Sequence, residues 1–485
     1  MSRPTTSSAL VAATVALSIS GCAVGPDYHA PAIAIDPAFV SAGASAVDAH
    51  DPASDLATFW KGFGDPVLDR LVARAIAANF DVRIAQARLQ EARAGLAGAR
   101  GNEFPEVDAA GSAGRALQPA YLYPGETRGQ RSGNAFDSHF IANWELDFFG
   151  HNRRVTESAA AQVDASEAGV HAARTVVIAE VARAYLDLRG LQQRQAVALQ
   201  SLENQRQTLH LVNVRLDAGR STQLDVARAS SLYDSTEATL PAIQAAIDRD
   251  AYRLATLTAQ SPRTVAVTLS SPQPLPTLPT TDLSSLPLGT PEQMLRRRPD
   301  LIAAERQLAS ANADIGVATA DLFPRISLTG AIGFGSNRTS QFGKRGSDEY
   351  SYGAGLVWPI LDFGRVRSRI HANEAVAAQA LASYEQTVAV ALEETEGALS
   401  QFSRSARQAD LMASATRSAD DATRLSRLRF TAGSVDLLIV LDAERQSLAA
   451  QDALVQAQVL QATSLVSVYR SLGGGWDPGS LVAAR

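Results

Sequence analysis

The stretch FDSHFIANWELDFFG, residues 136–150, alternates along its length between apolar and polar side chains. The apolar or small residues at every second position are Phe136, Ser138, Phe140, Ala142, Trp144, Leu146 and Phe148. The positions between them are polar, with Ile141 as the exception. A period of two places the two sets on opposite faces of a β-strand. The stretch therefore predicts a strand with one apolar and one polar face, near 136–148.

Three further segments have the same alternation, near residues 106–117, 325–336 and 350–361. Each is about as long as the roughly 9–11 residues that a tilted strand needs to cross a bilayer. Trp144 and Trp358 lie near strand ends, where aromatic residues collect in membrane barrels. A water-soluble antiparallel sheet with one wet face is the alternative. Four strands leave two open edges, which hydrocarbon does not tolerate, so the pattern predicts that several chains build one barrel.

The bulk composition excludes several classes of protein. The chain has 485 residues, 46% of them hydrophobic, and a formal net charge of −6. This is the composition of a folded chain. The absence of a dense basic stretch argues against nucleic-acid binding. The seven histidines are scattered and no HExxH, Walker A or GxSxG motif occurs, so we expect neither an enzyme nor a metal centre.

The N-terminal residues resemble a bacterial lipoprotein leader. Residues 1–21 combine Arg3 with an apolar run that is too short to span a bilayer, and Cys22, the one cysteine of the chain, follows them. The alternative is an ordinary signal peptide with a chance cysteine. Because Ala23 rather than an aspartate follows Cys22, the resemblance favours sorting to the outer membrane. We expect a covalent lipid on Cys22 and no other cofactor.

The chain contains an internal duplication. FPEVDAAGSAG, residues 104–114, matches FPRISLTGAIG at 323–333, and WELDFFGHNRR, residues 144–154, matches WPILDFGRVRS at 358–368. Each half is therefore expected to contain a helix, two strands, a long helix and a further helix. The expected segments are a leader (1–21), a lipidated N-terminal segment (22–64), the first repeat (65–270), a Pro-rich connector (271–290), the second repeat (291–472) and a tail (473–485).

The long helices are typical of a coiled coil. The expected helices cover residues 66–100, 152–216 and 222–260 in the first repeat and 291–320, 365–429 and 436–471 in the second. One heptad seam of the first long helix contains Val163, Val170, Val177, Ala184, Leu191 and Ala198. About 65 residues of helix extend for roughly 100 Å, longer than a single domain core. Gly219 and Gly433 suit the turns that end these helices, because glycine accepts the left-handed conformation.

The paired FP, W…FG and AG…LD motifs, the duplication and the lipobox followed by VGPDY resemble those of TolC-like outer membrane efflux proteins, in the NodT-type lipoprotein branch. The resemblance implies a mixed α and β membrane protein that forms a homotrimer. Four strands per chain would give a twelve-stranded outer-membrane β-barrel, continued by an α-helical barrel in the periplasm. It also implies a periplasmic adaptor and an inner-membrane RND-type transporter as partners, with outer-membrane lipid around the barrel.

The best candidates for functional side chains follow the second turn. Leu438, Asp442 and Arg445 are spaced to share one helix face, and in the resembling family the corresponding residues close the periplasmic aperture. Asp225 and Arg228 stand at the equivalent places of the first repeat and are expected to be ion-pair partners. The alternative is that Asp442 and Arg445 form a solvated surface pair worth well under ~1 kcal/mol.

These features predict a passive efflux duct of the Gram-negative outer membrane, which conducts drugs or other small molecules and opens on contact with its partners. A type I protein secretion duct or a metal efflux duct is the alternative within transport, although three methionines and no His/Met cluster give soft metals no support. A structural periplasmic coiled-coil lipoprotein is the alternative outside transport. The sequence names neither the cargo nor the transporter.

Overall fold

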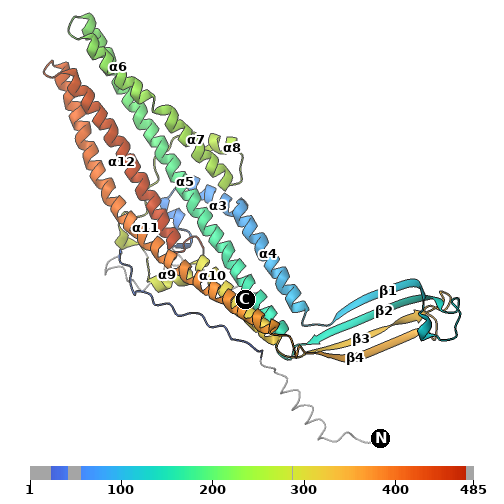
Figure 1. Cartoon of the computed structure of the whole chain (residues 1–485). Coiled ribbons are helices and arrows are strands. Elements are labelled where there is room, and N and C mark those ends of the chain that lie inside the picture. The colour runs from blue at the N-terminus through green and yellow to red at the C-terminus, as the bar shows by residue number, and fades with distance from the viewer. Residues whose placement is uncertain (1–22, 42–55, 287, 477–485) are drawn as a thin grey trace. The chain divides into compact units, whose positions relative to one another are not determined.

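The computed structural model describes residues 23–41, 56–286 and 288–476 (Figure 1). Cys22 and the leader lie outside these residues, so the predicted lipidation is not addressed by the structure. Within the described ranges, none of the helices is both long and apolar enough to cross a membrane. The described residues fold into two compact units, one of residues 23–32, 88–166 and 303–384 and the other of residues 33–41, 56–87, 167–286, 288–302 and 385–476.

The first unit contains a four-stranded antiparallel sheet in the order β1-β2-β3-β4. The strands are β1 (Glu106–Leu117), β2 (Ser132–Leu146), β3 (Arg325–Ser336) and β4 (Asp348–Val357). The expected strands at 106–117 and 325–336 are confirmed. The second and fourth strands begin four and two residues earlier than expected, because their ladders with β1 and β3 extend toward the β1–β2 and β3–β4 loops. They end two and four residues earlier than expected.

The register aligns the alternating patterns of the strands into two continuous faces. Phe140 pairs with Ala109 on one side and Ile332 on the other, and Ile332 pairs with Tyr350. Side chains of this apolar face are exposed in the single chain, with Ile332 at 65% and Tyr352 at 86%. The opposite face carries most of the charged strand residues. Both outer strands, β1 and β4, have one edge unpaired within the described chain.

The two halves of the sheet join their helices in the same way. Trp144 donates its indole N–H to the carbonyl oxygen of Glu103, and Trp358 donates to that of Leu322, each at 3.0 Å. The helices that flank the strands are α4 (Phe80–Gly101), α5 (His151–Asp217), α10 (Pro299–Ala320) and α11 (Arg365–Thr431). The triplets Phe148-Phe149-Gly150 and Asp362-Phe363-Gly364 form turns between strand and helix, since Gly150 and Gly364 have φ values of 82° and 86°.

The second unit has a hydrophobic core that collects segments from both ends of the chain. It includes η1 (Phe59–Phe63), α3 (Pro66–Ala78) and α8 (Pro262–Leu269), with parts of α5, α11 and α12 (Leu437–Ser471). The rings of Phe59 and Tyr469 stack at 4.7 Å. Tyr185 of α5 donates its hydroxyl to Asp65, the N-cap of α3, at 2.6 Å. Residues 56–63 and 469–472 therefore pack on the long helices of this unit.

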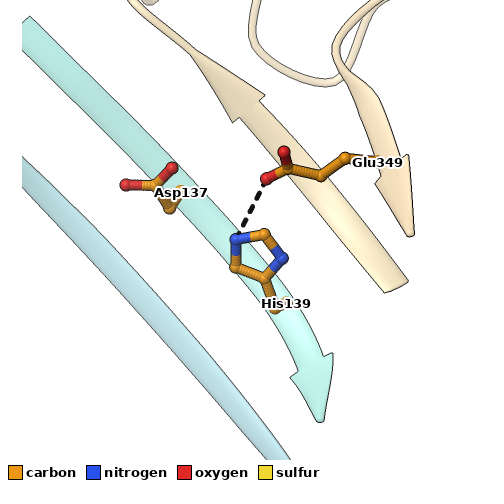
Figure 2. A group of neighbouring side chains, drawn as sticks. All are labelled: Asp137, His139 and Glu349. Atoms are coloured by element: carbon orange, nitrogen blue, oxygen red, sulfur yellow. Dashed lines mark ion pairs between the residues drawn. The ribbon is translucent and has the colours of Figure 1, made fainter. Parts of the chain in front are cut away.

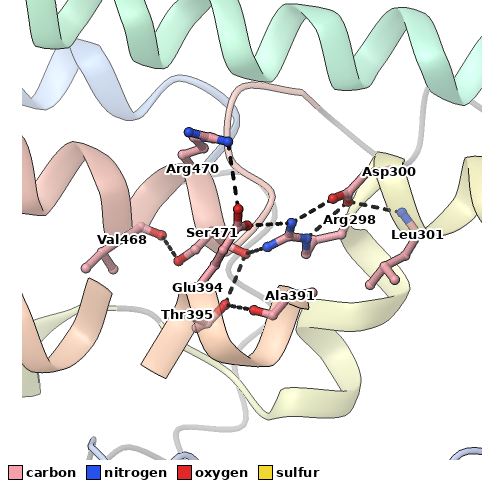
Figure 3. A network of polar contacts seen from close by, with 9 residues as sticks. All are labelled: Arg298, Asp300, Leu301, Ala391, Glu394, Thr395, Val468, Arg470 and Ser471. Atoms are coloured by element: carbon pink, nitrogen blue, oxygen red, sulfur yellow. Dashed lines mark hydrogen bonds and ion pairs between the residues drawn. The ribbon is translucent and has the colours of Figure 1, made fainter. Parts of the chain in front are cut away.

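A charged network fixes the start of the second repeat in this unit (Figure 3). The guanidinium of Arg298, whose side chain is 8% exposed, lies 2.6 Å from Asp300 and 2.9 Å from Glu394. It also donates to the carbonyl oxygen of Ser471 at 3.1 Å, at the end of α12. Because each N–H of a buried guanidinium needs an acceptor, this network ties the α9–α10 junction to α11 and α12.

Three of the expected helices are interrupted. The helix expected over 66–100 is divided into α3 and α4 at Asn79, whose side chain caps the second helix by accepting from the amides of Asp81 and Val82. The helix over 222–260 is divided into α6 (Gln223–Glu237) and α7 (Leu240–Leu257). The helix over 291–320 is divided into α9 (Pro291–Arg297) and α10, because Arg298 precedes a proline and is extended.

The two longest helices extend one or two residues beyond the expected bounds at most of their ends. Both α5 and α11 contain 67 residues. The last expected helix, over 436–471, begins one residue later, at Leu437, with Asp436 as its N-cap. The Pro-rich connector contains a single short 3-10 turn, η3 (Leu283–Ser285), among the described residues, and α8 is an additional short helix before it.

A partly buried histidine of the second unit, His171, predicts that the stability of the protein falls in acid. Burial, and to a lesser extent the positive charge of Arg174, lowers the pKa of His171 to about 4. The imidazole packs on the ring of Trp476 at 4.6 Å. Because the unfolded state then binds the proton more readily than the folded state, stability falls as the pH drops from about 6.5 to about 4.

Replacing His171 with leucine is expected to remove this loss of stability. When the pH falls from 7 to 4.5, the wild type should lose about 1–2 kcal/mol more unfolding free energy than the variant. This figure includes a discount for the partly exposed ring. Thermal denaturation of the detergent-solubilised protein across this range measures it. His210→Leu, at an exposed position of the same helix, is the control. Equal pH slopes for wild type and His171→Leu would contradict the prediction.

Candidate functional site

The two helical hairpins of the second unit end at glycine turns. Gly219 and Gly433 have φ values of 69° and 76°. At each turn the following residue donates its backbone N–H back to the preceding helix, Arg220 to Arg215 at 2.7 Å and Ser434 to Arg429 at 2.9 Å. This is the pattern of a glycine-terminated helix, and an L side chain would be strained at either glycine. We call the ends of the hairpins at these glycines the hairpin tips.

A small hydrophobic cluster joins the two hairpin tips. Its buried members are Val212, Ala229, Phe430, Leu437, Val440 and Leu441. Arg215 of α5 adds a polar contact, since its guanidinium lies 4.1 Å from the ring centroid of Phe430 and donates to the carbonyl oxygen of that residue at 2.8 Å. This contact satisfies a carbonyl at the end of α11. The tips of the two repeats therefore hold each other in one chain.

The predicted gate residues lie on one exposed face of α12. Arg445 donates to Asp442 at 2.6 Å, with side-chain exposures of 70% and 46%. Gln446 donates to the second oxygen of Asp442 at 2.7 Å. Leu438, one turn earlier, is 57% exposed. Leu438 and Asp442 also line a groove between α11 and α12. In the single chain this face carries an apolar side chain and an ion pair that contact solvent.

The equivalent aspartate of the first repeat has a local structural role. Asp225 accepts from the backbone N–H of Thr222 at 2.9 Å, and Thr222 accepts from the backbone N–H of Asp225 at 3.2 Å. This reciprocal pair is a capping box at the start of α6. The hydrogen bonds from Thr222 lower the pKa of Asp225, and the charge of Arg228 contributes less. The structure thus brings Asp225 to the helix N-terminus, with Arg228 acting on it through space.

Loss of this cap is expected to have a small, pH-dependent effect. Asp225→Ala should destabilise the start of α6 by about 1 kcal/mol at neutral pH. Because the pKa of Asp225 is lowered in the folded state, its contribution is complete above the unfolded pKa of 3.8 and is lost as the pH falls below it. Hydrogen exchange of the first turn of α6 measures the effect.

The matched control for the cap is Asp234→Ala, an exposed aspartate on the same helix. This control should leave the exchange of the first turn unchanged. The double variant Thr222→Ala/Asp225→Ala should cost little more than either single variant, since both remove one capping box. Fully additive effects would show that the two residues act independently and would contradict the capping role.

A buried ion pair at the hairpin tips escaped the sequence analysis. Glu444 of α12, whose side chain is 2% exposed, lies 2.8 Å from the guanidinium of Arg427 on α11. It also accepts from the hydroxyl of Thr208 on α5 at 2.7 Å. One carboxylate thus connects the hairpins of both repeats. In the sequence Glu444 lies between Ala443 and Arg445, and this context predicts an exposed residue on the helix surface. Only the packing of α5 against α12 buries it.

Comparisons with known proteins identify the family. The model of the family "Outer membrane efflux protein" matches residues 71–260 and 290–474. The outer membrane protein OprJ of Pseudomonas aeruginosa is 33% identical over 477 residues, which cover 97% of each chain. Nodulation protein T of Rhizobium leguminosarum bv. viciae is 32% identical and covers 98% of this chain and 95% of its own length.

A solved structure confirms the fold. The outer-membrane channel OprN superposes with a TM-score of 0.85 at 40% sequence identity, covering 94% of this chain and 100% of that structure. The predicted fold class, in which four strands per chain contribute to an outer-membrane barrel that continues into long helices, is therefore confirmed. The predicted resemblance and the predicted location in the outer membrane are confirmed as well. The chain belongs to the outer membrane efflux protein family.

Proposed function

We propose that three copies of this chain form the outer membrane channel of a tripartite efflux pump, which passively conducts small molecules from the periplasm to the exterior. The observation that carries the proposal is the four-stranded sheet, with two open edges and an apolar face of exposed side chains such as Ile332 and Tyr352. In hydrocarbon both edges require partners. Known barrels close with at least about eight strands, and three chains supply twelve.

The helical hairpins supply the entrance of the channel in this proposal. The exposed face with Leu438, Asp442 and Arg445 would repeat three times around the axis and narrow the periplasmic aperture. Contact of an adaptor protein with the hairpin tips would separate the repeated faces. The channel needs no ATP and carries out no reaction, so the energy for transport comes from an inner-membrane transporter of the RND class.

The cargo and the anchor complete the proposal. The polar face of the sheet presents carboxylates, amides, hydroxyls and glycines, which suits a passive conduit whose cargo is selected by the transporter. A lipid on Cys22 would anchor the N-terminus in the outer membrane. The alternative, a type I protein secretion duct, would use the same barrel and helices. Passage of a polypeptide rather than of small molecules would identify it.

Single-channel recording in planar bilayers tests this function. The purified full-length protein is expected to insert and to show a small, mostly closed conductance. Migration of heated and unheated samples on a denaturing gel verifies that the barrel is folded. If the protein is folded and inserted but never conducts, the channel proposal fails. A structural coiled-coil lipoprotein would then be the favoured function.

A further inference from the structure

Three potential metal ligands converge on the polar face of the sheet (Figure 2). They are Asp137 and His139 of β2 and Glu349 of β4, and one ligand atom from each lies within 4.8 Å of the others. The Nε2 atom of His139 is 3.2 Å from a carboxylate oxygen of Glu349. The side chains of His139 and Glu349 are 25% and 52% exposed, so an ion from solvent can reach them. These three residues form the strand cluster.

Two glycines of the intervening strand make room for the strand cluster. Gly333 of β3 pairs with His139 on one side and Glu349 on the other, and Gly335 pairs with Asp137. A Cβ atom at Gly333 would lie 2.6 Å from the Nδ1 atom of His139, and one at Gly335 would lie 2.7 Å from a carboxylate oxygen of Glu349. Because any larger residue would displace the ligands, side chains from β2 and β4 can meet across β3 only with glycine there.

The strand cluster combines two carboxylates with one imidazole and contains no lysine or arginine. The imidazole of His139 lies beside the carboxylate of Glu349. The strand cluster adds a second carboxylate, Asp137, and two carboxylates this close repel each other. Ser112 of β1 donates to Asp137 at 3.0 Å, which orients one carboxylate oxygen but brings no charge. A divalent cation would balance both carboxylates at once.

We propose that Asp137, His139 and Glu349 bind a divalent transition metal ion of the zinc class. Zinc accepts imidazole nitrogen and carboxylate oxygen, and three protein ligands leave a fourth position for water. The imidazole disfavours Ca²⁺ and Mg²⁺, which prefer oxygen ligands only. Ser112 acts as the outer partner that orients Asp137. All the ligands come from one chain, so binding does not depend on the proposed assembly or on conduction.

Isothermal titration of the purified full-length protein with ZnCl₂ tests the proposal. The protein carries an affinity tag without histidine and is freed of metal with a chelator beforehand. We expect one ion per chain, and we expect excess Mg²⁺ not to compete. His139→Asn and Glu349→Gln keep the size and polarity of each side chain and should weaken binding by more than the roughly 10–100-fold that loss of an outer partner costs. Ser112→Ala should weaken it within that range.

The matched control is another His–Glu pair of the chain. His371 and Glu374 of α11 lie 2.9 Å apart and are not part of any described cluster of three ligands. His371→Asn should leave the affinity for Zn²⁺ unchanged. If His139→Asn and His371→Asn bind Zn²⁺ as the wild type does, the strand cluster is an ion pair only and the proposal fails.

A second measurement uses the wild-type protein, in case a strand variant does not fold. Diethyl pyrocarbonate modifies accessible neutral imidazoles, and mass spectrometry locates the modified residues. Saturating Zn²⁺ is expected to protect His139 and to leave the modification of His371 unchanged. Equal modification of His139 with and without Zn²⁺ would overturn the proposal even when no variant is available.

Discussion

Replacing Arg427 with methionine is expected to destabilise the hairpin tips by about 3 kcal/mol. The physical reason is the burial of its partner, because the side chain of Glu444 is 2% exposed and its second carboxylate oxygen has no hydrogen-bond partner within the described structure. Without the guanidinium the carboxylate keeps its desolvation cost and loses its charge partner. Hydrogen exchange of the end of α11 and the start of α12 measures the loss, since these segments open locally before the whole protein unfolds.

The neighbouring ion pair on the same helix provides the control for this prediction. Arg424 and Asp421 are 3.1 Å apart, and their side chains are 62% and 68% exposed. Arg424→Met should change the exchange by less than about 1 kcal/mol, because exposed ion pairs contribute little. Equal effects of Arg424→Met and Arg427→Met would show that burial of Glu444 does not matter.

A double replacement separates the buried charge from the lost contact. Arg427→Met/Glu444→Leu removes both charges and should recover most of the protection, because a buried pair exchanged for apolar side chains is often neutral. Thr208 then retains its second acceptor, the carbonyl oxygen of Asn204 at 3.2 Å, and is not left unsatisfied. A double variant that is as unstable as Arg427→Met would point to packing rather than charge as the cause.

The strands were the most predictable part of this fold. The period of two over 106–117 and 325–336 predicted the bounds of these strands. It also predicted which face is apolar, because a shift by one residue would exchange the two faces. The first long helix was also predictable from its heptads, and the second from the internal duplication. The interruptions were not, since Asn79 divides a helix only by turning its side chain back to cap the next one, and a continuous apolar pattern hides such local competition.

The candidate site was predictable only where it depends on local spacing. Asp442 and Arg445 are three residues apart, and their contact is a property of any helix. The capping role of Asp225 has a sequence signature in the threonine three residues before it, which the expectation of an ion pair with Arg228 overlooked. Glu444 has no such signature. Its partner Thr208 is 236 residues away, and the strand cluster likewise depends on a register that no single strand encodes.

Neutralising the exposed pair on α12 is expected to have a large effect on conductance and almost none on stability. Asp442→Ala/Arg445→Ala should raise the closed-state conductance several-fold in planar bilayers. In the single chain this ion pair is exposed and contributes well under ~1 kcal/mol. An effect on conductance therefore requires that the pair act between chains or on the permeating ions, where three copies of the charges share one aperture.

Conductance and stability together show whether the exposed face of α12 is a gate. Increased conductance with an unchanged melting temperature locates a gate at Leu438, Asp442 and Arg445. Arg424→Ala/Asp421→Ala, an exposed pair with the same spacing on α11, is the matched control and should leave conductance unchanged. If both double variants conduct like the wild type, Asp442 and Arg445 form a solvated surface pair. The constriction would then lie elsewhere along the helices, since neutralising the pair would have changed no charge that permeating ions encounter.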